Sequence, residues 1–339
     1  MKDIAVIYYA YLVGDWHTML FEQLGRLLRS GLEEAAKEVW IVTCGIPEDG
    51  EGVRKAVEFM RVLPGTEGTK YKFLHRSNNA AEYPPLAKAK ELADTGDWNI
   101  LYFHTKGIAN TWLKQGSNEV SERKVIGKRG WRHFMEYFLI DKWRECVAKL
   151  DTHDMVVAHY GNDHWPHGNF WWASSDWLKQ CPPPIEGHTR WYYEGWATTS
   201  KPDPRVYEWK HLIFDFHTSD WPKWLYDGSR DLKDARLLVT KATWGPADVQ
   251  IDEGRQMPVD NPQIMDVTDK VCALVRADGR RLEVAASNSV FGEAHQGAVK
   301  MLKVWWTLGL GGPQTTVNIP GEPVYYTAAC ENYGIILEL

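Results

Sequence analysis

The feature that most constrains the fold is an alternation of strand-length apolar runs with helical segments in the first third of the chain. The β-prone runs lie at residues 4–11, 39–44, 71–75 and 99–104. Helical apolar periodicity separates them, at residues 18–30, 53–62 and 85–93. This alternation predicts an α/β domain with a mostly parallel sheet and helices on both faces. Because such sheets bind ligands beyond the carboxyl ends of their strands, the residues that follow each strand are the first candidates for a site.

The pattern changes in the second part of the 339-residue chain. A long helix is expected at residues 129–150, followed by strands at residues 155–159 and 169–173. Further strand-length runs, separated by Gly, Pro and Asn, lie at residues 237–243, 267–275, 282–287, 300–307, 314–319, 324–329 and 334–339. Their number and spacing are typical of a β-sandwich. We therefore expect an α/β domain over residues 1–232 and an all-β sandwich domain over residues 233–339.

Composition excludes several function classes. The net charge of −6 argues against a nucleic-acid backbone as the main partner. The 5 cysteines are widely spaced, which fits neither a disulfide framework nor a zinc site. No phosphate loop, G-x-G-x-x-G, G-x-S-x-G or H-E-x-x-H motif occurs, which disfavours P-loop NTPases, Rossmann dehydrogenases, α/β-hydrolases and zincins. We recognise no signal peptide or transmembrane segment, and we expect a soluble, cytoplasmic protein.

The most informative segment ends the fourth expected strand. This strand delivers His104, Thr105 and Lys106 to the carboxyl edge of the sheet, and Gly107 then allows a tight turn. Lys106 offers a positive charge to a diphosphate, and Thr105 offers a hydroxyl. A strand-ending turn with polar surface residues would give the same pattern. The position at a ligand-binding edge favours a functional interpretation.

A polar loop at residues 161–168 precedes a cluster of aromatic residues. One interpretation is a metal site, in which His164 and His167 of the loop are ligands and Asp163 and His217 are further candidates. The spacing fixes no third ligand, so the metal interpretation is the weaker one.

The alternative interpretation of the same loop is the floor of a pocket for an acceptor sugar. Trp171 and Trp172 would stack on the sugar ring, while His167 and Asn169 would hydrogen-bond its hydroxyls. The chain holds 18 tryptophans, and stacking is one use for them; core packing is the other.

A carboxylate among aromatic residues, Glu194, is the candidate general base. Partial desolvation would raise its pKa toward a useful value. Arg190, four residues earlier, would instead pair with it and keep it ionised, or would contact the acceptor. The sequence leaves these alternatives open.

Taken together, these segments resemble a family of capsule-type glycosyltransferases of bacteria and viruses. The matching motifs, in chain order, are His-Thr-Lys-Gly after a strand at 104–107, Trp-Arg at 131–132, Gly-Asn-Phe-Trp-Trp-Ala at 168–173 and Glu-x-Trp at 194–196. The resemblance implies a GT-A-like fold and a nucleotide-sugar donor, with UDP- or GDP-sugars expected. Most such enzymes carry Asp-x-Asp after the fourth strand, where it holds a divalent metal such as Mn²⁺ or Mg²⁺. This chain has His104-Thr105-Lys106 there, so dependence on a metal stays open.

The leading hypothesis is transfer of a sugar from a nucleotide donor to a hydroxyl acceptor, as in polysaccharide biosynthesis. The diphosphate would lie near Lys106, with the nucleoside against the edge formed by Tyr9 and Asp15. Glu194 would act as the base in an inverting reaction, whereas a retaining reaction would need no base in that role. Two alternatives are a non-catalytic, lectin-like carbohydrate-binding protein and a phage enzyme that glycosylates modified DNA bases.

Overall fold

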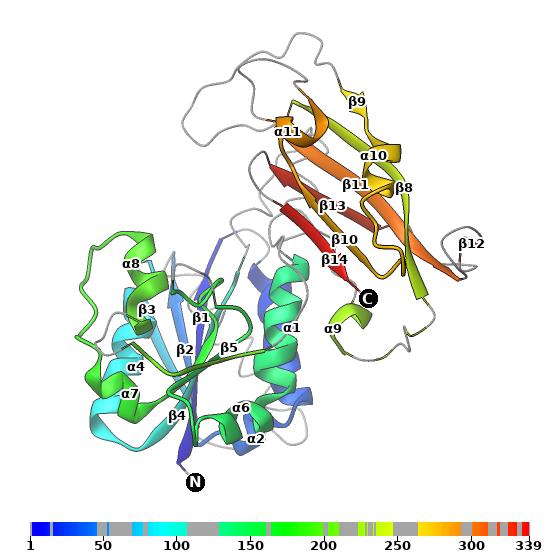
Figure 1. Cartoon of the computed structure of the whole chain (residues 1–339). Coiled ribbons are helices and arrows are strands. Elements are labelled where there is room, and N and C mark those ends of the chain that lie inside the picture. Colours follow the sequence, from blue (N-terminus) through cyan, green and yellow to red (C-terminus); the bar gives the residue numbers. More distant parts are fainter. Residues whose placement is uncertain are drawn as a thin grey trace. The chain divides into compact units, whose positions relative to one another are not determined.

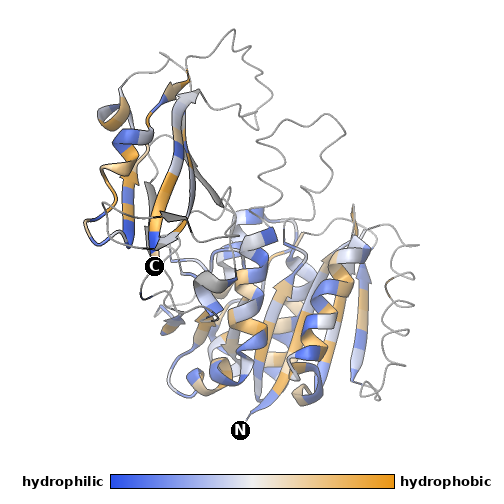
Figure 2. Ribbon diagram, turned by 90° about the vertical axis from the view of Figure 1, so that its right-hand side faces the viewer, coloured by the Kyte–Doolittle hydropathy of each residue, from blue (hydrophilic) through white to orange (hydrophobic). Residues whose placement is uncertain are grey.

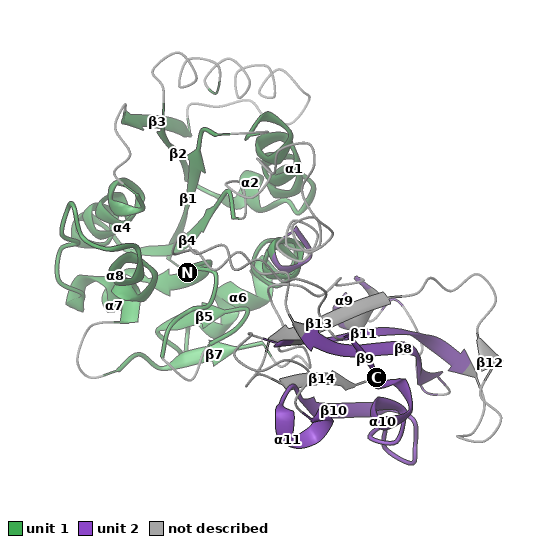
Figure 3. Ribbon diagram, turned by 90° about the horizontal axis from the view of Figure 1, so that it is seen from above, with its two compact units in different colours: residues 1–112, 132–210 green, residues 113–131, 211–339 purple. Residues whose placement is uncertain are grey.

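The structure of the protein is a computed structural model that forms two compact units. They comprise residues 1–112 with 132–210, and residues 113–131 with 211–339 (Figure 3). The expected domain boundary, at residue 232, falls outside the described residues. The structure describes residues 2–13, 16–45, 53, 70–76, 81–106, 129–160, 164–198, 203–209, 223–227, 229, 233, 235–246, 264–292, 300–310, 317–318, 325–330 and 334–338.

The first unit is built on a seven-stranded sheet (Figure 1). Its strands are β1 (Asp3–Tyr11), β2 (Glu38–Cys44), β3 (Tyr71–Arg76), β4 (Trp98–His104), β5 (Met155–Val157), β6 (Trp171–Ser174) and β7 (Val206–Glu208). They lie in the order β3-β2-β1-β4-β6-β5-β7. β6 runs antiparallel to both of its neighbours, and the other neighbouring pairs are parallel. The expectation of a mostly parallel sheet is confirmed.

Helices cover both faces of this sheet, as its apolar strands require. One face carries α4 (Tyr83–Thr95), α7 (Ser175–Gln180) and α8 (Arg190–Gly195), and the other carries α1 (Trp16–Arg29), α2 (Leu32–Ala35) and α6 (Trp143–Lys149) (Figure 3). In Figure 2 the strands carry long apolar stretches, whereas the helices alternate apolar and polar segments. α1 buries Met19, Leu20, Leu24 and Leu27, which recur at helical spacing.

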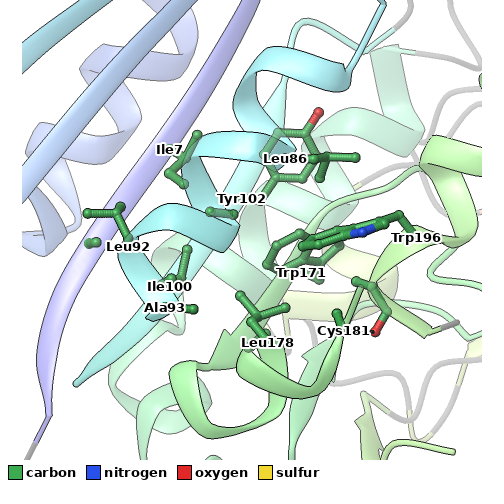
Figure 4. Close-up of a cluster of buried hydrophobic side chains, with 14 of the residues drawn as sticks. Ile7, Leu86, Leu92, Ala93, Ile100, Tyr102, Trp171, Leu178, Cys181 and Trp196 are labelled. Atoms are coloured by element: carbon green, nitrogen blue, oxygen red, sulfur yellow. Dashed lines mark hydrogen bonds between the residues drawn. The ribbon is translucent and has the colours of Figure 1, made fainter. Parts of the chain in front are cut away.

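The core under α4 and α7 positions the carboxyl edge of the sheet. Tyr102 of β4 and Trp171 of β6 pack with Leu86 of α4, Leu178 of α7 and Trp196 (Figure 4). Trp196 begins the short helix η3 (Trp196–Thr198) and donates its indole N–H to the Pro182 carbonyl at 2.9 Å. This aromatic packing joins β4, β6 and the segment that carries α8 into one rigid body of side chains.

The long helical segment expected at residues 129–150 is confirmed, although it is not one regular α-helix. Residues 129–136 are α-helical, a π-helical turn η2 (Tyr137–Asp141) follows, and α6 starts only after Lys142. A π turn joins residues five apart, which brings Glu136 and Asp141 to the same side of the helix. There Arg26 of α1 pairs with both, at 3.0 Å and 2.6 Å. These partly buried ion pairs give a physical reason for the interruption.

The strands of the second unit pair in antiparallel fashion. They are β8 (Ala235–Pro246), β9 (Met265–Asp266), β10 (Arg281–Ala285), β11 (Lys300–Leu310), β12 (Val317–Asn318), β13 (Tyr325–Cys330) and β14 (Gly334–Glu338). β8 and β11 form the centre of one sheet, with β9 beside β8 and with β12 and β13 beside β11, while β10 pairs with β14. Trp244, Trp306 and Leu282 from the two sheets share one core. The expectation of a separate antiparallel β domain is confirmed.

One expected strand of this unit, at residues 267–275, is wrong. β9 ends at Asp266, and α10 (Thr268–Cys272) follows. The Asp266 carboxylate accepts hydrogen bonds from the Thr268 amide and hydroxyl, at 2.9 Å and 2.6 Å. Such local bonds favour the start of a helix over continuation of a strand. Two further short helices are α9 (Trp224–Asp227) and α11 (Asn288–Phe291). No helix among the described residues has the length and apolar character needed to cross a bilayer.

Candidate functional site

The carboxyl ends of β1 and β4 meet at the edge where the sequence placed the donor site. The Thr105 amide donates to the Tyr9 carbonyl at 3.0 Å, and the Tyr11 amide donates to the Thr105 hydroxyl at 3.1 Å. Tyr9 and Thr105 are both buried, and the Tyr9 ring belongs to the core. In the free protein these two residues therefore build the edge, and their expected direct role in donor binding stays a prediction.

His104 is also a structural residue. Its Nε2 lies 3.0 Å from the Gly168 carbonyl, so the neutral ring donates from Nε2. Burial, assisted by the positive charge of Lys106, lowers the pKa of His104 to about 3. The side chain thus stays uncharged and holds the loop before β6 against the end of β4. Its expected contact with a donor stays a prediction.

Lys106 is the charged residue of this edge. Its side chain is buried, and burial lowers the pKa of its ammonium group. The negative charges of Glu194 and Glu82 oppose that change, and the positive charge of Arg190 adds to it. The charges that act on Lys106 therefore form one electrostatic cluster with it: Glu194, Arg190 and Glu82. The sequence indicated Glu194 and Arg190 as site residues, but it did not indicate Glu82.

Glu82 is the residue that the sequence reasoning missed. It immediately precedes α4, and its Oε2 accepts hydrogen bonds from the Tyr102 hydroxyl at 2.7 Å and from Nδ2 of Asn169. Burial raises the pKa of Glu82, while these two donors and Lys106 oppose the change. A carboxylate directly before the Tyr-Pro-Pro start of a helix, a few residues after β3, is the signal that could have identified it.

Asn169 makes side-chain hydrogen bonds through both ends of its amide. Besides Glu82, its Nδ2 donates to the Tyr193 carbonyl at 3.3 Å, and its Oδ1 accepts from the Trp171 indole at 2.9 Å. Its backbone is in the left-handed region with φ of 54°, a conformation that asparagine tolerates better than most residues. The residue is buried and positions its neighbours, and its expected contact with an acceptor hydroxyl stays a prediction.

The expected acceptor platform of Trp171 and Trp172 is also wrong. Both side chains are 0% exposed. As neighbours on β6 they point to opposite faces of the sheet: Trp171 joins the core of Figure 4, and Trp172 donates its indole N–H to the Leu139 carbonyl at 2.7 Å. Neither indole presents a face to a sugar.

Arg190 and Glu194 lie one helical turn apart on α8, whose N-terminus is capped by Thr189. The Arg190 Nε donates to Glu194 Oε1 at 2.7 Å. Of the two roles left open for Arg190, pairing with Glu194 is the one observed. The arginine side chain is 65% exposed and the glutamate side chain 12% exposed, so the arginine can move away while the carboxylate stays in place.

His167 lies at the carboxyl ends of β5 and β7, beside a second histidine. Its ring is 4.9 Å from the ring of His159, and Nδ1 of His159 lies 2.8 Å from Glu208 Oε1. His164 is exposed and has a positive φ of 63°. Within the described part of the chain, no three His, Cys, Asp or Glu side chains are grouped to hold a metal ion. The remaining candidates Asp15, Gly107, Asp163 and His217 lie outside the described residues.

The chain was compared with protein families and with curated proteins. No protein-family model matches the chain, and no curated protein matches it.

Proposed function

We propose that the first unit is a glycosyltransferase that moves a sugar from a nucleotide-sugar donor to a hydroxyl acceptor. The observation that carries the proposal is the buried Lys106 in one electrostatic cluster with Glu194 and Arg190, at the carboxyl edge of a mostly parallel sheet. This edge is where open α/β sheets bind ligands. The GT-A-like identity of the fold rests on the sequence resemblance, and the mixed sheet with its antiparallel strand β6 is compatible with it.

Lys106 is suited to hold the diphosphate of the donor. Lys106 is 7% exposed, and the attraction between its charge and an anion would be stronger there than in bulk water. Lys106 would also stabilise the negative charge that develops on the departing nucleoside diphosphate. A UDP- or GDP-sugar is the expected donor. Where a divalent metal such as Mn²⁺ or Mg²⁺ takes part, it would add charge to the same phosphates.

Glu194 is suited to act as the base of an inverting reaction. It would take the proton of the acceptor hydroxyl while the acceptor oxygen forms a bond to the anomeric carbon. The bond from that carbon to the phosphate oxygen breaks, and its electron pair leaves with the nucleoside diphosphate. Arg190 pairs with the carboxylate in the free protein and, being exposed, can turn toward the phosphates when the donor binds.

The substitution Glu194→Gln tests this role. We expect the release of nucleoside diphosphate from the productive donor, among a panel of UDP- and GDP-sugars, to fall about 100-fold or more. Affinity for the donor should stay within about threefold, because Gln keeps the size of the side chain. Glu186→Gln is the control, because Glu186 is an exposed carboxylate that pairs with Arg76. Near-normal turnover by Glu194→Gln would eliminate Glu194 as the base.

A lectin-like protein is the second candidate, and the exposed Trp191 beside this site favours it. A lectin needs no diphosphate site. A thermal-shift measurement with UDP, GDP and CMP separates the two functions, since a ligand that binds only the folded state raises the melting temperature. The transferase predicts a shift with at least one nucleotide, and the lectin predicts none.

A further inference from the structure

Two tryptophans beside the candidate base form an aromatic surface that the sequence did not indicate. Trp191 of α8 is 62% exposed. Trp165, from the loop before β6, stacks against it with ring centroids 6.4 Å apart and an angle of 27° between the ring planes. A single exposed tryptophan needs no explanation, whereas two neighbouring indoles offer a larger apolar area that a ligand could cover.

Gly195 is the residue that allows Trp165 to lie in this position. A Cβ atom at Gly195 would lie 2.7 Å from Nε1 and 2.9 Å from Cε2 of Trp165. Only glycine at this position lets the indole of Trp165 lie directly on the backbone of α8. Contact with Gly195 therefore fixes the position of Trp165, and the indole of Trp165 in turn packs against the exposed Trp191.

One side chain connects the aromatic surface to the candidate base. The Arg190 guanidinium lies 5.7 Å from the centre of the Trp191 ring, and its Nε donates to Glu194 at 2.7 Å. Trp191 and Glu194 thus contact the same arginine from two sides. A ligand lying on Trp191 would have its polar groups within reach of the arginine and the carboxylate.

We propose that Trp165 and Trp191 bind a sugar ring of the acceptor, so that the acceptor is a saccharide. A pyranose ring offers an apolar face of C–H groups to an indole and a rim of hydroxyls to Arg190 and Glu194, which matches the mixture present here. A DNA acceptor would require neutralised phosphates, and the chain has a net charge of −6. That this saccharide is the acceptor rests on the proposed function. That a saccharide binds to the two tryptophans does not.

The test is saccharide binding by the whole chain without nucleotide, measured by titration calorimetry. The probes are hexasaccharides of glucose in α-1,4, β-1,4 and β-1,3 linkage, of β-1,4-linked mannose and of chitin. We expect at least one to bind, and Trp191→Ala and Trp165→Ala each to weaken that binding about tenfold or more. Phe21→Ala is the matched control, because Phe21 is an exposed aromatic residue of α1, 44% exposed, outside the site. Circular dichroism melting checks that each variant is folded.

Two results would overturn the inference: no binding of any hexasaccharide, or equal binding by the wild type and Trp191→Ala. Failure of the proposed function looks different. If the protein binds a saccharide through Trp191 but binds no nucleotide, the aromatic site is supported and the transferase function is contradicted. If the protein turns over a nucleotide-sugar but binds none of the saccharides, the transferase function is supported and the aromatic site is contradicted.

Discussion

Asn169 donates a hydrogen bond from its side-chain amide to the carboxylate of Glu82, which lies 87 residues earlier in the chain. The contact joins the loop before β6 to the start of α4. Tyr102 reaches the same carboxylate oxygen from β4, and the Trp171 indole reaches the other end of the asparagine amide. This buried network fixes the elements that surround Lys106, so its removal should be costly.

Asn169→Gly should lower the free energy of unfolding by about 3 kcal/mol, because it leaves a carboxylate and an indole N–H with fewer partners in a buried place. Glycine accepts the positive φ, so backbone strain does not contribute. His164→Gly is the control: that residue has a positive φ of 63° in the same loop but is exposed. Its replacement should leave stability unchanged or raise it by up to about 1 kcal/mol. Equal losses in urea unfolding of the two variants would contradict this account of Asn169.

His104 should make the protein less stable in acid. Its pKa is lowered to about 3 in the folded protein, whereas in the unfolded chain it is near the ordinary value of 6.5. Between these values the unfolded chain binds a proton that the folded chain does not, so stability is lost as the pH falls below 6.5. From pH 7 to pH 5 the loss from this group is about 2 kcal/mol.

His104→Gln isolates that contribution, because glutamine cannot titrate and its amide can still donate to the Gly168 carbonyl. Denaturant unfolding of both proteins at pH 7 and pH 5 measures it, and the other titrating groups cancel in the difference. We expect the wild type to lose about 2 kcal/mol more than the variant. The same loss in both would mean that His104 is protonated in the folded protein.

Binding of a nucleoside diphosphate should take up a proton on Lys106. Burial lowers the pKa of Lys106 in the free protein, and a bound diphosphate would raise it again. At a pH between the two values the protein gains a proton on binding, and affinity falls as the pH rises through the pKa of the free protein. Calorimetric titration with UDP or GDP at a series of pH values, in buffers of different ionisation enthalpy, measures the uptake.

Lys106→Met should bind without this uptake. Methionine has a similar length and suits a buried position, so the variant is expected to fold. Proton uptake of the same size in Lys106→Met would assign the titration to another group.

Gly195→Ala should displace Trp165 and lower stability, because the added methyl group would overlap the indole. Gly25→Ala in α1 is the matched change. There the nearest atom is the flexible end of Arg29, at 3.1 Å, so alanine should stabilise the helix by up to about 1 kcal/mol. The two variants are therefore expected to shift the melting temperature in opposite directions. If Gly195→Ala melts at or above the wild-type temperature, Trp165 does not lie against the backbone as described.

The sheet of the first unit could be predicted because its signals are local. The apolar runs of β1, β2, β3 and β4 and the helical periodicity of α1 and α4 each occupy a few consecutive residues. Their alternation then dictates a mostly parallel arrangement. The helical segment at residues 129–150 was predicted, but its π turn was not. The turn lies where Glu136 and Asp141 pair with Arg26, more than 100 residues away.

The aromatic residues of the site were assigned the wrong way round for a similar reason. Trp171 and Trp172 follow a polar loop, which suggested a pocket, but the sheet of which they become part is buried on both faces. In the sequence nothing distinguishes Trp191 from the other tryptophans. Its exposure depends on which side of α8 packs against the rest of the unit. Glu82 became a member of the site only through Tyr102 and Asn169, which no local pattern connects to it.

The measurement that tests the central claim most directly compares UDP with UMP, and GDP with GMP, by titration of the wild type and Lys106→Met. The account predicts that the wild type binds at least one diphosphate about tenfold or more tightly than its monophosphate, and that Lys106→Met binds the two alike. The account is contradicted if the wild type binds none of these nucleotides, or if Lys106→Met keeps the full preference for the diphosphate.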